Sequence, residues 1–193
     1  MTKNIMIVGV GGQGSLLASR IIGNAVLLKN YDVKVSEVHG MSQRGGSVTT
    51  YVKYGDKVAS PVICKGEADV IISFELLEAA RWLPYLKKDG VIVTNTQQIN
   101  PMPVVTGTAQ YPENLVEKMK AAGAKVIAED ALAIAREAGN EKAVNVALIG
   151  LVAHSLGFDE DTLREAIKIS VPEKFLELNL RAFELGVNKG GKN

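Results

Sequence analysis

Cysteine and histidine are nearly absent from this sequence, and their scarcity excludes several kinds of site. Cys64 is the only cysteine, so no internal disulfide can form. A single thiol also cannot hold an iron–sulfur cluster, which requires about four ligands that are mostly cysteine. The two histidines, His39 and His154, stand far apart and belong to no paired metal-ligand motif. We therefore expect no metal site in this chain.

Long apolar runs and an excess of one charge are also missing. No run reaches the roughly 18 residues that a transmembrane helix requires, and the first residues lack the features of a secretory signal. Lys and Arg number 22, and Asp and Glu number 21. This balance gives no reason to expect a nucleic acid or a membrane as partner. Together with the single thiol, it is typical of a cytoplasmic protein, and we expect that location.

Apolar segments of strand length alternate with segments of helical periodicity along most of the chain. Hydrophobic residues make up 47% of the 193 residues, enough for a domain with a full core. The expected strands cover residues 4–8, 33–38, 47–54, 68–74, 90–94 and 124–128, with a short antiparallel strand at 57–60. This alternation predicts an α/β fold, a three-layer Rossmann-like domain with a mostly parallel sheet and a helical C-terminal third.

The helical C-terminal third sets the expected limits of the domain. Its helices are predicted at 143–156, from the N-cap Asp159 to before Pro172, and onward to a last helix that stops at Gly186. The segment 188–193 has nothing to bury and is expected to form a flexible tail. Because no linker divides the chain, we expect a single domain over 1–187.

The pattern GVGGQG at residues 9–14 lies between the first strand and the first helix. Its G-x-G-x-x-G spacing is typical of a turn that brings a phosphate to the free N–H groups and the dipole at a helix start. An NAD site would also require an acidic residue near the end of the second strand, where Glu37 lies. A tight turn that binds no ligand remains the alternative.

A second polar, glycine-rich loop follows the second strand. Ser42 and Arg44 precede Gly45 and Gly46, which lead directly into the third strand. In a parallel sheet the second strand ends at the same edge as the first turn, so the two loops could hold a diphosphate-like group in an electropositive notch. Arg44 offers a permanently charged fork for a phosphate. The alternative is a flexible surface loop, although Met41 within it favours a covered one.

The remaining histidines and the cysteine have ordinary structural explanations. His39 is expected to make a hydrogen bond within its loop, and His154 is expected to pack inside an apolar helix. Cys64 is interpreted as a small buried residue rather than a nucleophile, because no base is visible beside it.

Three asparagines flank the expected elements. Asn140 and Asn145 lie at a helix start, where capping is the expected role. Asn95 follows a strand at the expected ligand edge, and it either lines the cleft or serves the turn.

Several segments together resemble a known family. The resemblance is carried by GVGGQG, SEVHGMSQRGGSV, ISFELLEAAR, VIVTNT and GNEKAVNVALIG. These segments are similar to the gamma domains of the 2-oxoacid:ferredoxin oxidoreductases, and within that family to the beta subunits of its indolepyruvate branch. The resemblance covers almost the whole ordered chain, and HGMSQRGG is its most specific part. It implies that residues 1–187 form one gamma-type catalytic domain.

The resemblance implies that the chain works as a subunit. Enzymes of this family decarboxylate a 2-oxoacid on thiamine diphosphate, pass electrons through iron–sulfur clusters to ferredoxin, and capture the acyl group with coenzyme A. The indolepyruvate branch acts on arylpyruvates. The gamma domain carries neither the thiamine nor the clusters, in keeping with the single cysteine here. Thiamine diphosphate, Mg and iron–sulfur clusters are therefore expected only in a partner subunit. Ferredoxin is expected to interact with this chain only indirectly, through that partner subunit.

The resemblance also implies which residues help to form a shared coenzyme A pocket. They are Gly11, Gly12, Gln13 and Gly14 from the first loop and Ser42, Arg44, Gly45 and Gly46 from the second. No catalytic residue is expected in this chain. Two alternatives stay open: a stand-alone regulatory or scaffold domain that binds NAD, a flavin or an adenine nucleotide, and a gamma subunit specific for pyruvate, ketoisovalerate or 2-oxoglutarate.

Overall fold

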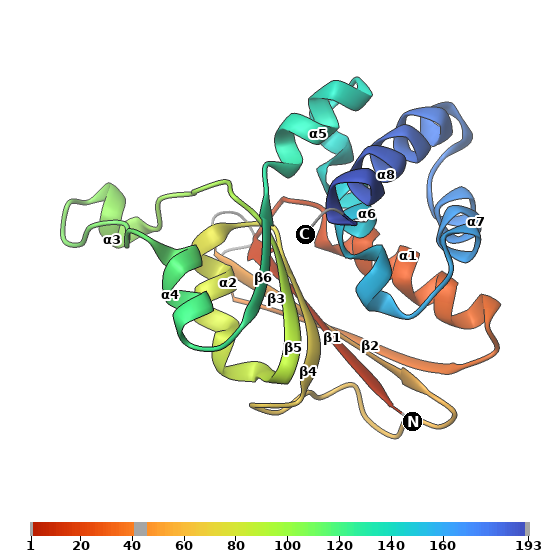
Figure 1. The fold of residues 1–193 in the computed structure, drawn as a ribbon, viewed down its shortest axis with the longest axis horizontal. Helices are drawn as coiled ribbons and strands as arrows, with labels where there is room; N and C mark the ends of the chain where they lie inside the picture. Colours follow the sequence, from red (N-terminus) through yellow and green to blue (C-terminus); the bar gives the residue numbers. More distant parts are fainter. Residues whose placement is uncertain (1, 41–45, 192–193) are drawn as a thin grey trace.

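The computed structural model describes residues 2–40 and 46–191 and shows the three-layer α/β fold that the sequence predicts (Figure 1). A six-stranded sheet lies between two layers of helices. Its strands are β1 (Lys3–Val10), β2 (Asp32–His39), β3 (Ser47–Gly55), β4 (Ala68–Ser73), β5 (Leu86–Asn95) and β6 (Lys125–Glu129). Their order across the sheet is β2-β3-β1-β4-β5-β6.

The centre of the sheet is apolar on both faces. In β1, Ile5 and Ile7 pack into the core on one side, while Met6 and Val8 pack into the core on the other, and all four are fully buried. β1 pairs in parallel with β4, β4 with β5, and β5 with β6. The carboxyl ends of these strands therefore share one rim, which is where α/β proteins of this kind bind ligands.

The β2–β3 hairpin makes the sheet mixed. β3 runs antiparallel to both of its neighbours, β1 and β2, so β2 points in the same direction as β1. The predicted strand at 57–60 is wrong: these residues form no strand, and Val58 N donates to Asp32 Oδ2 at 2.8 Å. Because β1 and β2 already occupy both edges of β3, no edge was left for a third partner.

The larger helical layer covers one face of the sheet. It contains α1 (Ser15–Leu28), α5 (Ala131–Ala138), α6 (Val144–Leu156), α7 (Glu160–Ser170) and α8 (Leu176–Gly190). The other face packs against α2 (Leu76–Trp82) and α4 (Leu115–Ala121). The short segments are η1 (Leu83–Tyr85), α3 (Met102–Val105), η2 (Glu141–Ala143) and η3 (Glu173–Phe175). The helical C-terminal third is thus confirmed.

Helix starts follow the local sequence signals. Asp159 caps α7 as predicted, because its Oδ1 accepts from Thr162 N at 2.8 Å. Asp130 caps α5 in the same manner, accepting from Ala133 N at 2.8 Å. These caps fix where the helices begin after their loops.

The predicted end of the last helix at Gly186 is wrong, because α8 continues to Gly190. Gly186 is instead a contact between helices: an ideal Cβ on it would lie 2.4 Å from Ala147 O of α6. Gly150 faces the same crossing, where its Cβ would lie 2.3 Å from Phe183 O. Gly186, which the sequence pattern indicated as the end of a helix, instead lets the backbones of α6 and α8 touch. Residues 188–190 are helical and not part of a tail.

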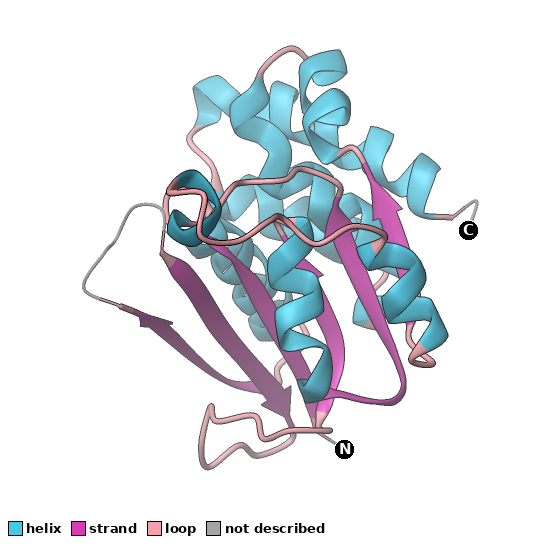
Figure 2. Cartoon of the chain, turned by 90° about the vertical axis from the view of Figure 1, so that its left-hand side faces the viewer, coloured by secondary structure: helices cyan, strands magenta, loops and turns pink. Residues whose placement is uncertain are grey.

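The hairpin half of the sheet is covered on only one face. Figure 2 shows α2 and the neighbouring helices in front of the central strands, whereas β2 and β3 have no helix in front of them. Among the described residues, no helix is long and apolar enough to span a bilayer.

Candidate functional site

The first glycine loop is braced by Gln13. Its Oε1 accepts from Val10 N at 2.7 Å, and its Nε2 donates to Phe74 O at 3.1 Å, at the end of β4. Gly9 leaves room for this arrangement, because an ideal Cβ there would lie 2.8 Å from Gln13 Oε1. The Gln13 side chain therefore folds back onto its own chain and positions the turn.

The backbone of the turn presents unused donors. Gly12 and Gly14 have positive φ values of 99° and 91°, and Gly14 is the residue from which α1 starts. Within the described part of the chain, the N–H groups of residues 12–16 have no acceptor. Successive N–H groups at a helix start form a site for a phosphate or another anion.

The two glycine-rich segments meet at one rim of the sheet, as the sequence predicts. Gly11 N donates to Gly46 O at 2.9 Å, and Val10 is paired with Ser47 in the ladder between β1 and β3. The sequence analysis expected this from a parallel sheet, but β3 lies between β1 and β2 and runs antiparallel to both. The rims still coincide, since β1 and β2 point in the same direction. Three of the predicted residues, Ser42, Arg44 and Gly45, lie outside the described residues.

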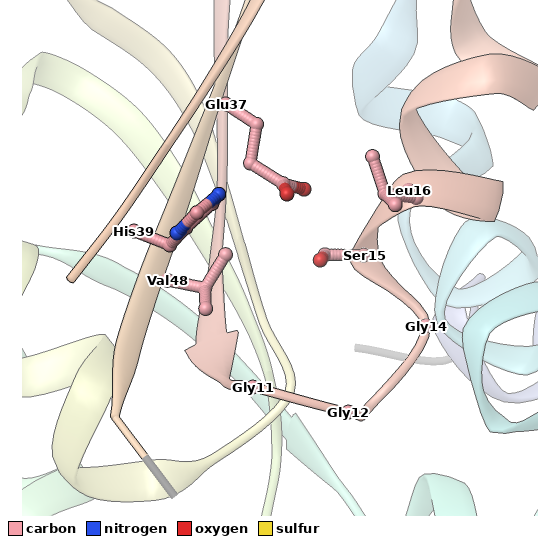
Figure 3. A pocket seen from close by; sticks show the side chains of 8 residues that line it. All are labelled: Gly11, Gly12, Gly14, Ser15, Leu16, Glu37, His39 and Val48. Carbon is pink, nitrogen blue, oxygen red and sulfur yellow. The ribbon is translucent and has the colours of Figure 1, made fainter. Parts of the chain in front are cut away.

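A cleft of about 500 Å³ lies between the glycine turn, the start of α1 and the β2–β3 hairpin (Figure 3). It is lined by Gly11, Gly12, Gly14, Ser15, Leu16, Glu37, His39 and Val48. Figure 3 shows the Glu37 carboxylate pointing across the cleft toward the start of α1. Glu37 Oε2 also accepts from Thr50 Oγ1 at 3.3 Å.

The lining does not match the electropositive notch that we expected. Within the described residues it contains the Glu37 carboxylate and no lysine or arginine. His39 lies on the same side, and its Nδ1 is 3.1 Å from Gly40 O, in keeping with the expected loop hydrogen bond. The attraction for an anion in this part of the cleft therefore comes from backbone N–H groups.

Two buried carboxylates beneath the rim were missed by the sequence reasoning. Glu75 is 1% exposed and caps α2, accepting from Glu78 N at 2.8 Å. It also accepts from Tyr111 OH at 2.5 Å and from Ile99 N at 3.0 Å. Burial, followed by the hydrogen bond to Glu75, raises the pKa of Tyr111, so its hydroxyl remains a donor.

Glu78 connects this network to the second segment. It is 4% exposed, and its Oε2 accepts from Ser47 Oγ at 2.5 Å, while its Oε1 accepts from Arg81 Nε at 3.0 Å. The start of β3 is thus fixed to α2. The sequence signal was the pair of acidic residues in the first turn after a buried strand, a place where acidic side chains stabilise a helix.

The asparagines differ in role. Asn140 caps η2 as predicted, accepting from Lys142 N at 2.9 Å. Asn95 is fully buried and serves the turn: its Oδ1 accepts from Ala131 N at 3.0 Å, at the start of α5. Asn145 does not cap α6; it packs against Gly14, where an ideal Cβ would lie 2.8 Å from its Nδ2.

Two expectations of burial are wrong. Cys64 is exposed in the connection between β3 and β4. His154 is also exposed, because it lies on the outer side of the last turn of α6. Among the described residues, no group of three or more His, Cys, Asp or Glu side chains is placed to hold a metal ion.

Comparison with known proteins gives this geometry a family context. Residues 4–189 match the family described as pyruvate ferredoxin/flavodoxin oxidoreductase. The chain is 48% identical over 191 residues to the indolepyruvate oxidoreductase subunit IorB of Thermococcus kodakarensis, covering 95% of this chain and 94% of that protein.

Solved structures share the fold. The gamma subunit of keto/oxoacid ferredoxin oxidoreductase from Geobacter sulfurreducens superposes with a TM-score of 0.74 at 24% identity, covering 99% of both chains. The 2-oxoglutarate:ferredoxin oxidoreductase of Magnetococcus marinus, solved with 2-oxoglutarate, coenzyme A and succinyl-CoA bound, gives a TM-score of 0.68 at 18% identity. The match covers all of this chain and 31% of that one.

Proposed function

This chain belongs to the pyruvate ferredoxin/flavodoxin oxidoreductase family, and we propose that it is the non-thiamine, cluster-free subunit of a 2-oxoacid:ferredoxin oxidoreductase of the indolepyruvate type. The enzyme would convert an arylpyruvate to its acyl-CoA and CO₂ and pass the two electrons to ferredoxin. The relatives are oxidoreductase subunits, which favours this function over a stand-alone nucleotide-binding regulator. No catalytic acid or base is assigned to this chain.

The observation that carries the proposal is the meeting of the two glycine-rich segments. The hydrogen bond from Gly11 N to Gly46 O closes them into one rim, beside the unused N–H groups of residues 12–16. The diphosphate of coenzyme A fits such a row of donors. Coenzyme A, when bound, supplies the thiol that accepts the acyl group. In this proposal Gly11, Gly12 and Gly14 contact the ligand, while Gln13 holds the turn in shape.

The surface around the cleft supports a partner subunit that completes the site. Leu16 on the cleft wall is 61% exposed, and Val35 and Val38 of the edge strand β2 are 47% and 54% exposed. Apolar side chains gathered beside an open cleft are typical of an interface. Val35 shares the cleft side of β2 with Glu37, whereas Val38 lies on the opposite face, which has no helix in front of it in Figure 2, so both faces of this edge strand expose apolar side chains. We propose that the partner carries the thiamine diphosphate, Mg and iron–sulfur clusters.

The subunit role can be tested by co-expression with the large subunit of a related enzyme. We expect the purified complex to reduce a ferredoxin substitute when supplied with an arylpyruvate and coenzyme A, and the lone chain to have no activity. Activity of the lone chain would contradict the proposal, and so would failure to associate with a thiamine-binding partner.

The cofactor role has a separate test. In the complex, Arg44→Ala should raise the KM for coenzyme A at least about tenfold, because a charged hydrogen bond contributes about 1.5–3 kcal/mol. The matched control is Arg181→Ala on α8, an exposed arginine outside the cleft, and its KM should not change. An unchanged KM for coenzyme A in Arg44→Ala would contradict the cofactor role, and the loops would then have only a structural role. Titration of the complex with NAD should show no binding.

A further inference from the structure

A second cleft lies on the opposite side of the glycine turn, between that turn and the start of α6. Its volume is about 440 Å³. It is lined by Gly12, Gln13, Gly14, Gln97, Leu132, Glu141, Lys142, Val144 and Asn145. Because Gly12 and Gly14 line both clefts, the turn is the wall between them. The residues of the second loop take no part in this cleft within the described part of the chain.

Asn145 is the unusual side chain in this cleft. It is 6% exposed, on a helix whose other buried residues are aliphatic or glycine. Its Oδ1 accepts from Val146 N at 2.9 Å, but its Nδ2 has no acceptor among the residues that the structure describes. Because Nδ2 is open to the cleft and has no protein acceptor there, it is a donor that an acceptor atom of a ligand can reach.

The glycine turn is shaped to receive this amide. An ideal Cβ on Gly14 would lie 2.8 Å from Asn145 Nδ2 and 3.6 Å from its Cγ, so only glycine lets the side chain approach so closely. The amide donor therefore lies next to the free N–H groups of the turn. Donors from two separate segments, the turn and α6, converge on the same cleft.

The charged residues of the cleft favour an anion. Lys142 lines it and has no ion-pair partner in the described residues. Glu141 also lines it, but its Oε1 accepts from Arg136 Nε at 2.8 Å, so its charge is compensated. The side-chain groups available to a ligand are thus an ammonium group and an amide donor, a set that suits an oxyanion with several acceptor atoms.

We propose that this cleft is a second anion subsite, in which Asn145 Nδ2 and Lys142 bind a phosphate-type group on the α6 side of the glycine turn. The subsite shares the glycine turn with the cleft that contains Glu37 and His39, but its side-chain donors, Lys142 and Asn145, do not line that cleft. Its occupation therefore does not depend on the proposed subunit function.

The test is a titration of the full chain with inorganic pyrophosphate, followed by calorimetry and by the side-chain amide resonance of Asn145. We expect saturable binding and a shift of this resonance. Asn145→Asp keeps the size and the acceptor to Val146 N but replaces the donor with a negative charge, and it should weaken binding at least about tenfold. Lys142→Gln should weaken binding less and reduce its dependence on salt.

Asn140→Asp is the matched control. It adds the same charge near the cleft, and aspartate caps a helix as well as asparagine does, so binding should change less than about threefold. Circular dichroism reports whether each variant folds. If Asn145→Asp does not fold, the proposal is tested by the shift of the Asn145 amide resonance in the wild type and by the affinity of Lys142→Gln for pyrophosphate. The proposal is overturned if the Asn145 resonance does not respond to pyrophosphate, if only residues of the Glu37 cleft respond, or if a folded Asn145→Asp binds as the wild type does.

Discussion

Substitution of the two positive-φ glycines in the first turn separates backbone strain from the contact with Asn145. Gly12 and Gly14 have similar φ values of 99° and 91°. A Cβ on Gly12 would meet nothing within 4 Å, whereas on Gly14 it would lie 2.8 Å from Asn145 Nδ2. In both alanine variants, a residue with a Cβ in the left-handed region costs about 1–2 kcal/mol. Only Gly14→Ala also displaces a side chain, that of Asn145.

The additional cost at Gly14 follows from what Asn145 must give up. To make room, its amide has to turn away, which breaks the hydrogen bond from Val146 N to its Oδ1. That loss is about 1 kcal/mol, and confinement in a buried helix start adds to it. We therefore expect Gly12→Ala to lower the free energy of unfolding by about 1–2 kcal/mol, and Gly14→Ala by about 2–4 kcal/mol.

The assay is urea unfolding of the full chain, monitored by circular dichroism. With a slope of about 2 kcal/mol per molar, the two variants should lower the midpoint by about 0.5–1 M and 1–2 M, with unchanged slopes. Asn145→Ala combined with Gly14→Ala should show a favourable coupling of about 1 kcal/mol, because the clash is gone. Equal losses in the two single variants, or no coupling in the cycle, would refute the role assigned to this contact.

Three further predictions concern the scaffold. Gly186→Ala would place a Cβ 2.4 Å from a backbone carbonyl of α6 and should cost about 3 kcal/mol in unfolding free energy, whereas Gly23→Ala, with open space around it, should stabilise by up to about 1 kcal/mol; thermal midpoints check both. Tyr54→Phe leaves a buried carbonyl at the end of α6 unpaired and should cost about 1–3 kcal/mol. Burial raises the pKa of Tyr54 above 10.0, so its contribution is present below pH 10 and lost above it, and urea midpoints of the variant should fall less steeply there than those of the wild type. The hydrogen bond from Lys29 lowers the pKa of Asp159 below 3.8, so its contribution is lost as the pH falls below that value, and Asp159→Asn should flatten the acid-side decline in the same assay.

The strands and most helices were predictable because each has a local pattern. The continuous apolar runs in β1, β4 and β5 indicated strands buried on both faces, and Asp159 marked the start of α7. The direction of β3 was also available in principle. The link at 40–46 is too short for the crossover that a parallel neighbour requires, so it had to be a hairpin.

Features that depend on how elements meet were not predictable from local patterns. Gly186 has the sequence appearance of a helix stop, and only the crossing of α6 and α8 shows it as a packing residue. His154 lies in an apolar helix but on its outer side, which hydrophobicity alone does not reveal. Asn145 was expected to cap α6, since nothing in the sequence indicates that α6 begins beside Gly14. In each case the deciding contact joins residues far apart in the chain.

The sheet order also decides against an ordinary dinucleotide site. In the Rossmann arrangement the acidic residue that holds the ribose is on the strand next to β1. Here β3 occupies that place, and Glu37 lies on β2, one strand further out, which is about 10 Å from β1 at the usual strand spacing. Glu37 is also opposite Thr50, whose partner in β1 is Ile7, three residues before the rim.

A ligand whose diphosphate lies on the glycine turn would therefore meet a wide cleft with one carboxylate rather than a ribose pocket. The described lining offers that ligand backbone donors but no cation. Its remaining negative charge requires a positive group from outside this lining, and the choices are Arg44 in the second loop, Lys142 on the other side of the turn, or a side chain of another polypeptide. A complete site thus needs a positive group beyond the turn itself, and in the proposed enzyme a partner subunit is one source of it.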